Sequence, residues 1–168
     1  MWQIPKMWSG ERCWIIGGGV SFPTQFGVPD DVIDRVASGG LSPYAYIPWL
    51  KPLQNEHVIG TNIAYLLGES IVDILLFSDP PFFRTNHGGI DAFSGLKVTC
   101  ARLGDSEWPE HQNDILVLRK DLKQGIESRR GDRIRWNGHT GGAAINLAVL
   151  LGVKEIYLLG FDMKSDEK

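Results

Sequence analysis

Short apolar runs, each ended by turn-forming residues, dominate the pattern of hydrophobic and polar positions along the chain. Runs of this kind predict buried strands, at about residues 12–17, 57–62, 72–77, 96–100, 115–118 and 155–159. Helices are predicted between them, at about 30–37, 63–67, from Pro80 onward and at 143–151. Strands that alternate with helices imply a parallel sheet covered on both faces. We therefore expect a Rossmann-like, doubly wound α/β fold with a mostly parallel sheet, in a single domain spanning residues 1–168.

Three segments interrupt this alternation. Residues 38–56 combine two glycines, three prolines and several aromatics, and predict an irregular excursion packed by its own aromatic side chains. Residues 103–114 predict an acidic loop. Residues 119–139 begin with a basic stretch, which is either a solvated surface or a lid that folds over phosphates, with Arg133 or Arg135 closest to the site.

Composition and charge narrow the function classes. The 168 residues are 43% apolar, enough for one core, and the net charge of -3 gives no general attraction to nucleic acid or an anionic membrane. No apolar run approaches the roughly 18 residues of a membrane span, and residues 1–6 lack the apolar core of a signal peptide. Cys13 and Cys100 fall in or beside predicted strands, as buried apolar residues do. We expect a cytoplasmic protein that binds neither nucleic acid nor membranes.

Small, polar or acidic residues follow the ends of the predicted strands. They are Gly17–Ser21, Thr61-Asn62, Ser78-Asp79 and Gly160-Phe161-Asp162. In open parallel sheets, ligands bind at this edge. A second glycine-rich turn, Gly138–Gly142, leads into the predicted apolar helix, whose N-terminus is another natural anion site. The sequence therefore predicts one ligand site along the carboxyl edge of the sheet.

The glycine-rich segments match neither of two common nucleotide-binding motifs. No Walker phosphate loop is present, and Gly17-Gly18-Gly19 matches only the first two glycines of the dinucleotide fingerprint. That fingerprint also needs an acidic residue at the end of the second strand, where this chain has Thr61-Asn62. A dehydrogenase or methyltransferase is therefore the weakest interpretation, whereas a nucleotide whose ribose or base is held by an amide is compatible with the sequence.

Five segments carry a resemblance to a known family. They are residues 17–21, residues 59–65, Ser78-Asp79, residues 140–148 and residues 156–163. Together they resemble the MptE-like family (6-hydroxymethylpterin diphosphokinase-like), which is grouped with motility-accessory-factor glycosyltransferase-like proteins and includes many small phage proteins. The resemblance covers roughly residues 12–163 and is most specific in the last two segments. More distantly, the layout is similar to bacterial sialyltransferases that use CMP-sialic acid.

The resemblance implies roles for individual residues. Gly18, Gly19 and Ser21 would face phosphate, Asn62 would face the ribose or base, and Thr140, Gly141 and Gly142 would hold the other side of the nucleotide. Two positions depart from the family pattern, since Val20 replaces its usual proline and His139-Thr140 replaces its usual Asn or Ser. Members of the family also continue beyond the position of Lys168 with a histidine-containing tail.

Four further side chains are candidates from their chemistry. Asp79 could bind Mg²⁺ on a diphosphate, or serve as the N-cap of the helix beginning at Pro80. Asp162 could contact ribose or metal, or cap a turn. His87 and His139 are candidates for a general base, against the plain alternative of polar surface residues.

These observations leave two main functions open. The first is a nucleotide-dependent transferase that binds a nucleotide or nucleotide-sugar donor, with Mg²⁺ as a candidate cofactor, and moves a glycosyl or diphosphoryl group to a small-molecule acceptor. The second is a non-catalytic nucleotide-binding or phage accessory protein, acting in the host cytoplasm. The sequence leaves the nucleotide base, the acceptor and the oligomeric state open, a homo-oligomer included.

Overall fold

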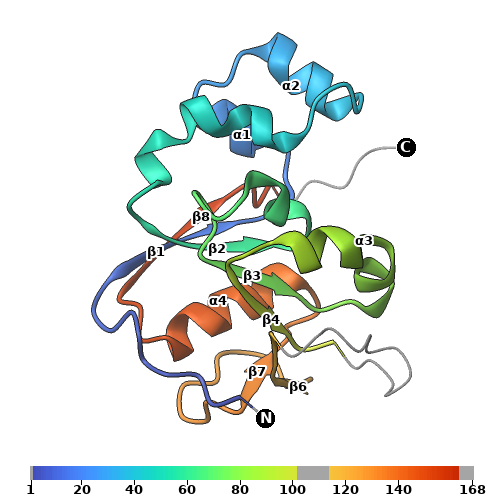
Figure 1. Cartoon of the computed structure of the whole chain (residues 1–168). Coiled ribbons are helices and arrows are strands. Elements are labelled where there is room, and N and C mark those ends of the chain that lie inside the picture. Colours follow the sequence, from blue (N-terminus) through green and yellow to red (C-terminus); the bar gives the residue numbers. More distant parts are fainter. Residues whose placement is uncertain (1, 102–113, 163–168) are drawn as a thin grey trace.

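A six-stranded, fully parallel sheet forms the centre of the molecule (Figure 1). The computed structural model describes residues 2–101 and 114–162. The strands are β1 (Arg12–Ile16), β2 (His57–Thr61), β3 (Ile74–Phe77), β4 (Leu96–Thr99), β5 (Ile115–Val117) and β8 (Glu155–Leu159). Their order in space is β5-β4-β3-β2-β1-β8. This arrangement confirms the expected Rossmann-like α/β fold.

The position of β8 creates the switch in strand order. The chain adds β2 to β5 successively on one side of β1, and then returns to place β8 on its other side. Cys13 of β1 is paired with His57 of β2 and with Ile156 of β8. The strand order therefore switches between β1 and β8, and open α/β sheets bind ligands at the carboxyl ends of the strands at such a switch point.

Alternating side chains of the strands build a core on each face of the sheet. Cys13 and Ile15 of β1 belong to the core under α4 (Thr140–Leu150), whereas Ile16 belongs to the core on the opposite face. That opposite face is covered by helical elements, which are α1 (Ser21–Gln25), α2 (Asp30–Ala37), η1 (Pro43–Trp49), η2 (Lys51–Leu53), η3 (Asn62–Leu67) and α3 (Pro80–Ala92). The positions of α2, η3 and α3 match predicted helices, whereas α1 was not predicted, and η1 and η2 lie in the segment predicted to be irregular.

The excursion at residues 38–56 packs as part of this helical layer. Tyr46 of η1 is buried in the core, together with Leu50 and Leu53, while Tyr44 is exposed. The expected aromatic packing is therefore present, and aliphatic side chains contribute to it as much as aromatic ones. The expected acidic loop at 103–114 lies, except for Asp114, outside the described residues.

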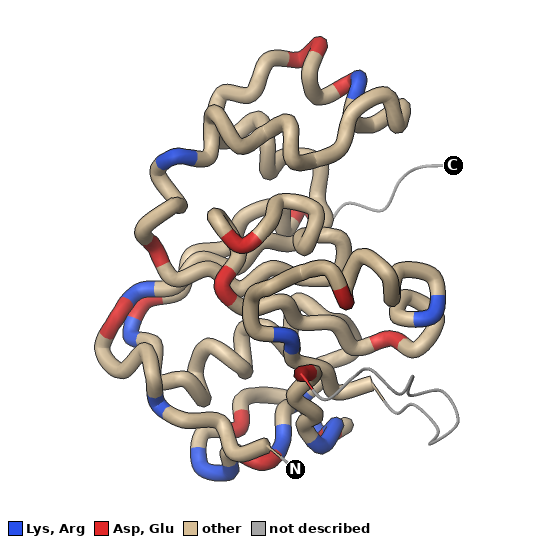
Figure 2. Tube along the Cα trace, viewed as in Figure 1, with Lys and Arg blue, Asp and Glu red and all other residues tan. Residues whose placement is uncertain are grey.

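The basic stretch folds into a small two-stranded parallel sheet of β6 (Arg119–Asp121) and β7 (Arg133–Arg135). Asn146 of α4 fixes it, because its Oδ1 accepts from the Arg135 N–H at 2.7 Å and its Nδ2 donates to the Glu127 carbonyl at 2.7 Å. The Arg135 guanidinium donates to the Gln124 carbonyl at 2.9 Å. Figure 2 shows acidic and basic residues mixed around these strands. The Arg135 Nε is buried, lies 3.9 Å from the Asp121 carboxylate and has no hydrogen-bond partner among the described residues. Neither Arg133 nor Arg135 is among the described residues that line the cleft at the carboxyl edge of the sheet.

No helix among residues 2–101 and 114–162 is long and apolar enough to cross a membrane.

Candidate ligand-binding site

A cleft of about 420 Å³ opens at the carboxyl edge of the sheet, at the switch point between β1 and β8. Segments that follow three strands line it, together with the start of α4. The lining residues are Gly17, Gly18, Gly19, Val20, Thr61, Asn62, His139, Thr140, Gly141, Gly160, Phe161 and Asp162. The cleft thus brings together most of the residues that the sequence pointed to.

The three glycines of the first turn differ in their surroundings. The N–H groups of Gly17 and Gly19 donate to the carbonyls of Leu159 and Gly160, each at 2.8 Å. A Cβ on Gly17 would lie 2.7 Å from the Gly160 oxygen, and one on Gly19 would lie 2.5 Å from the same atom. A Cβ on Gly18 would meet nothing within 4 Å. Gly17 and Gly19 therefore let the turn approach β8, whereas Gly18 faces open space.

Asp162 caps the short helix that follows the glycine turn. Its Oδ2 accepts from the Ser21 N–H at 3.0 Å, and its Oδ1 accepts from the Ser21 hydroxyl. Ser21 was expected to face phosphate, but it does not line the cleft and both of its donors are directed to Asp162. The sequence left two roles open for Asp162, contact with a ligand or metal and capping of a turn. The two hydrogen bonds to Ser21 support the capping role.

Asn62 combines two unusual properties at the end of β2. Its φ of 50° lies in the left-handed region, which costs non-glycine residues energy. Its Oδ1 is buried and has no hydrogen-bond partner among the described residues. The preceding Thr61 is fixed differently, since its hydroxyl donates to the Ile16 carbonyl at 2.9 Å. A strained residue with an unsatisfied acceptor, lining a cleft, is typical of a binding position.

The N-terminus of α4 forms another wall of the cleft. His139 is its N-cap, and the His139 Nδ1 accepts from the Gly142 N–H at 3.0 Å. In neutral imidazole the other nitrogen then carries the proton, so Nε2 is a donor. A Cβ on Gly141 would lie 2.6 Å from the Phe161 ring. Gly141 is therefore glycine because α4 packs against the segment after β8.

A buried polar network lies behind Thr140. The hydroxyls of Ser78 and Thr140 are hydrogen-bonded to each other, and the Trp136 indole N–H donates to the Ser78 hydroxyl at 3.2 Å. Thr140 also contacts the Asp79 carboxylate at 3.4 Å, and the Lys120 ammonium lies 3.7 Å from the Trp136 ring centroid. Sequence reasoning missed Trp136 and Lys120, because only the fold brings β6 and β7 to the end of β3.

Asp79 and His87 lie away from the cleft lining. Asp79 stands at the N-cap position of α3, but its side chain makes no capping hydrogen bond and is directed to Thr140. His87 is exposed on α3, with Nδ1 at 3.0 Å from the Arg84 carbonyl of the same helix. Within the described ranges, no group of three or more His, Cys, Asp or Glu side chains is arranged to hold a metal ion.

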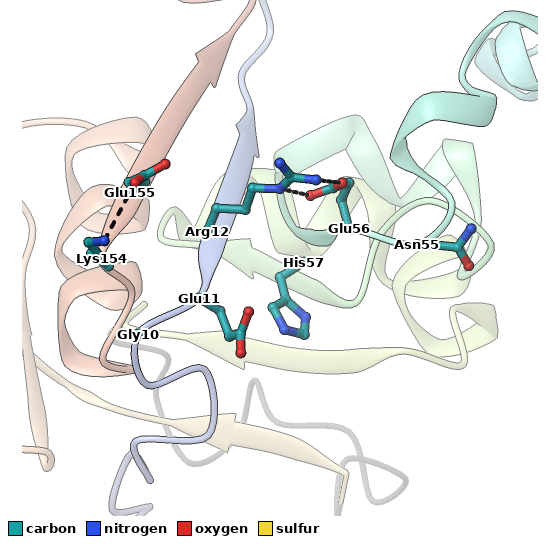
Figure 3. Close-up of a pocket in the computed structure, with 8 residues that line it drawn as sticks. All are labelled: Gly10, Glu11, Arg12, Asn55, Glu56, His57, Lys154 and Glu155. Carbon is teal, nitrogen blue, oxygen red and sulfur yellow. Dashed lines mark hydrogen bonds and ion pairs between the residues drawn. The ribbon is translucent and has the colours of Figure 1, made fainter.

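A second polar pocket, of about 410 Å³, lies at the opposite edge of the sheet (Figure 3). Four of its charged groups form ion pairs, Arg12 with Glu56 and Lys154 with Glu155. Hydrogen bonds from Arg12 hold the pKa of the Glu56 carboxyl below its ordinary value. This edge carries the amino ends of the strands, which open α/β sheets do not use for ligands. We therefore place the candidate site at the carboxyl edge.

Comparisons with known proteins add no relative. No family model matches the chain, and neither the curated proteins nor the solved structures contain a significant match to it.

Proposed function

We propose that this protein is a nucleotide-dependent transferase whose donor binds across the switch point between β1 and β8. One observation carries the proposal. The open Gly18, the unsatisfied Oδ1 of Asn62 and the N-terminus of α4 all meet in a single cleft. The strained backbone and the unsatisfied oxygen of Asn62 cost free energy in the free protein. A bound polar ligand would use that oxygen, the open space at Gly18 and the backbone donors at the start of α4.

The polar groups of the cleft suit the two ends of a nucleotide. The Gly18 N–H, the free N–H groups in the first turn of α4 and the Nε2–H of His139 are donors, as phosphate oxygens require. The Asn62 Oδ1 is an acceptor, which suits a ribose hydroxyl or an amino group of the base. We therefore orient the phosphates toward α4 and the nucleoside toward the end of β2.

In a glycosyl transfer, the bond between the sugar carbon and the donor phosphate oxygen breaks. The acceptor oxygen forms the new bond to that carbon and gives up its proton. Negative charge then grows on the leaving phosphate, where the backbone donors and the start of α4 would stabilise it. A diphosphoryl transfer would use the same donors on the phosphate groups themselves. Mg²⁺ would neutralise part of the phosphate charge, and Asp79, whose carboxylate lies 3.4 Å from the hydroxyl of the cleft residue Thr140, is the residue that would hold it.

A second candidate is a nucleotide-binding module without catalysis. Two observations favour it: His139 uses Nδ1 as a helix cap, and among the described residues no lysine or arginine lines the cleft. Such a protein would bind the same ligand and leave it intact. Incubation with the bound nucleotide and an analysis of the products separates the two candidates.

The first experiment is a thermal-shift panel of CMP, CDP, UDP, GDP, ADP, ATP, NAD and S-adenosylmethionine, with and without Mg²⁺. A ligand at a hundredfold excess over its dissociation constant stabilises the fold by about 2.7 kcal/mol. We expect one nucleotide to give such a shift. A shift with NAD or S-adenosylmethionine alone, or with no compound, would overturn the proposal.

Two variants test the position of the site. Gly18→Ala places a methyl group in open space where the phosphates would lie, and Asn62→Gly removes the unsatisfied oxygen while relieving the left-handed backbone. Both should fold and lose the nucleotide shift. Gly88→Ala on α3 is the matched control, because its Cβ also meets nothing within 4 Å and it lies outside the cleft. Retention of the full shift in both cleft variants would contradict this placement.

A further inference from the structure

An apolar cavity of about 470 Å³ lies on the other side of the glycine turn from the polar cleft. Its walls come from helical elements on one face of the sheet, including Phe22 of α1, Val36 of α2 and Tyr46 of η1. Gly17, Gly18, Gly19 and Val20 line both spaces. The glycine turn is therefore the shared wall between a polar and an apolar compartment.

The apolar face of α2 is evidence that an apolar ligand binds in this cavity. Val32, Ile33 and Val36 lie on one side of this helix and are only half-buried, and α2 has no fully buried residue. These side chains pack against the core with only part of their surface, whereas amphipathic helices normally bury such a stripe more completely. At the boundary of the cavity, Val20 is 82% exposed and Ile63 is 50% exposed. A concentration of exposed apolar side chains around a hollow marks a binding site.

The lining excludes polar ring systems. No charged side chain lines the cavity, and Tyr46 carries the one polar side-chain group there among the described residues. A nucleobase or pterin ring would bury several nitrogen and oxygen atoms without partners, and each such buried group weakens binding. A hydrocarbon buries no such atoms. The lining side chains are mostly aliphatic, including Ile33, Leu41 and Leu67.

We propose that this cavity binds the hydrocarbon chain of an amphiphilic acceptor, whose polar end reaches past the glycine turn into the cleft. The inference rests on the proposed function for the identity of the donor, and it specifies the acceptor as a lipid-type alcohol or phosphate. The volume is within the range of cavities that enclose a drug-sized ligand. The shared turn at Gly18 would then bring acceptor and donor together.

The test uses octyl, decyl and dodecyl phosphate below their micelle concentrations, with inorganic phosphate as the polar reference. Affinities are measured by titration calorimetry. Each buried methylene should tighten binding about fourfold until the cavity is full. A binding constant that does not change with chain length would overturn the proposal, because it would indicate recognition of the phosphate alone.

A pair of variants on α2 locates the bound chain. Val36 lines the cavity, whereas Val32, one helical turn earlier and also half-buried, does not. Val36→Asp should weaken dodecyl phosphate binding by at least about tenfold, since a carboxylate would enter the apolar space. Val32→Asp is the matched control for any general loss of stability and should bind nearly as well as the unmodified protein. Equal weakening in both variants would overturn the assignment.

The nucleotide panel tests the donor site and the alkyl phosphate series tests the acceptor cavity, so either proposal can be contradicted without the other. A nucleotide shift without chain-length-dependent binding overturns this inference and leaves the proposed donor site standing. Alkyl phosphate binding that Val36→Asp abolishes, without any nucleotide shift, supports the cavity and removes the transferase proposal. Binding of a pterin in place of the alkyl series would overturn the inference in favour of a polar-ring acceptor.

Discussion

At the scale of single residues, the three glycines of the first turn have different reasons to be glycine. Gly17 and Gly19 face the backbone after β8 at distances that no side chain could occupy, whereas Gly18 faces the cleft. Gly17 and Gly19 therefore maintain the fold, and Gly18 keeps space for a ligand. A substitution at each position should separate these two roles.

We predict that Gly19→Ala lowers the free energy of unfolding by about 1–3 kcal/mol, as overpacking does in other proteins. Its Cβ would lie 2.5 Å from the Gly160 oxygen and 2.7 Å from the Asp162 Oδ2. Gly18→Ala should leave stability nearly unchanged. Urea unfolding of the two variants measures the difference, and equal stabilities would show that the turn can move away from β8.

The sequence identified the glycine turn but could not rank its glycines. Three consecutive glycines after an apolar run predict a turn that approaches something closely. What they approach is Gly160 and Asp162, from the far end of the chain. Only the pairing of β8 with β1 decides which glycine is open, so the different role of Gly18 required the structure.

At the scale of elements, the start of α4 shows how one side chain serves both helix and cleft. The sequence placed this helix at 143–151, and it spans Thr140–Leu150. The earlier start is explained by His139, which accepts from the Gly142 N–H and satisfies one of the unpaired donors of the first turn. The sequence made His139 one candidate for a general base, against the alternative of a polar surface residue. In this geometry Nδ1 is occupied as an acceptor and Nε2 is left to donate.

We predict that His139→Ala lowers the free energy of unfolding by about 1 kcal/mol, as the loss of an N-cap usually does. His139→Asn should retain most of the stability, because asparagine is a strong N-cap residue. Denaturant unfolding measures both. If the two variants lose the same stability, the histidine ring acts through packing rather than through the cap.

The sequence did not predict strands β6 and β7, and both were missed for the same reason. β6 and β7 are three residues each and rich in charge, with the sequences Arg-Lys-Asp and Arg-Ile-Arg, so they carry no apolar run. Their pairing depends on Asn146 of α4, which is distant in the sequence from β6. The inner strands of the main sheet, such as the fully buried β3, were predictable because burial on both faces requires continuous apolar residues. The edge strand β8 was predictable because it keeps an apolar run, although Tyr157 and Leu158 are partly exposed. The small sheet has no such requirement.

At the scale of the whole molecule, the two buried thiols make stability depend on alkaline pH. Desolvation raises the pKa of Cys13 to about 12 and that of Cys100 to about 11. An unfolded cysteine has a pKa of about 8.5. Above that pH the unfolded chain loses these protons while the native protein keeps them. The stability contribution is therefore complete below the unfolded pKa and declines as the pH rises.

We predict that each thiol lowers the free energy of unfolding by roughly 1 kcal/mol per pH unit above about pH 8.5. A Cys13→Ala, Cys100→Ala double variant should show a shallower decline than the unmodified protein. Urea unfolding at several alkaline pH values measures the two slopes. Parallel slopes would indicate that the thiols are accessible to water in the native protein.

The pairing of β1 with β8 also affects how the protein folds during its synthesis. The two strands lie near opposite ends of the described chain, so their contact closes a very long loop. The ribosome releases β1 to β5 first, and these strands can assemble before β8 is synthesised. Until then, the edge of β1 that later pairs with β8 has no partner. That waiting edge is exposed to other nascent chains. The cleft exists only after β8 has docked, so the ligand can meet only a chain whose synthesis has passed β8.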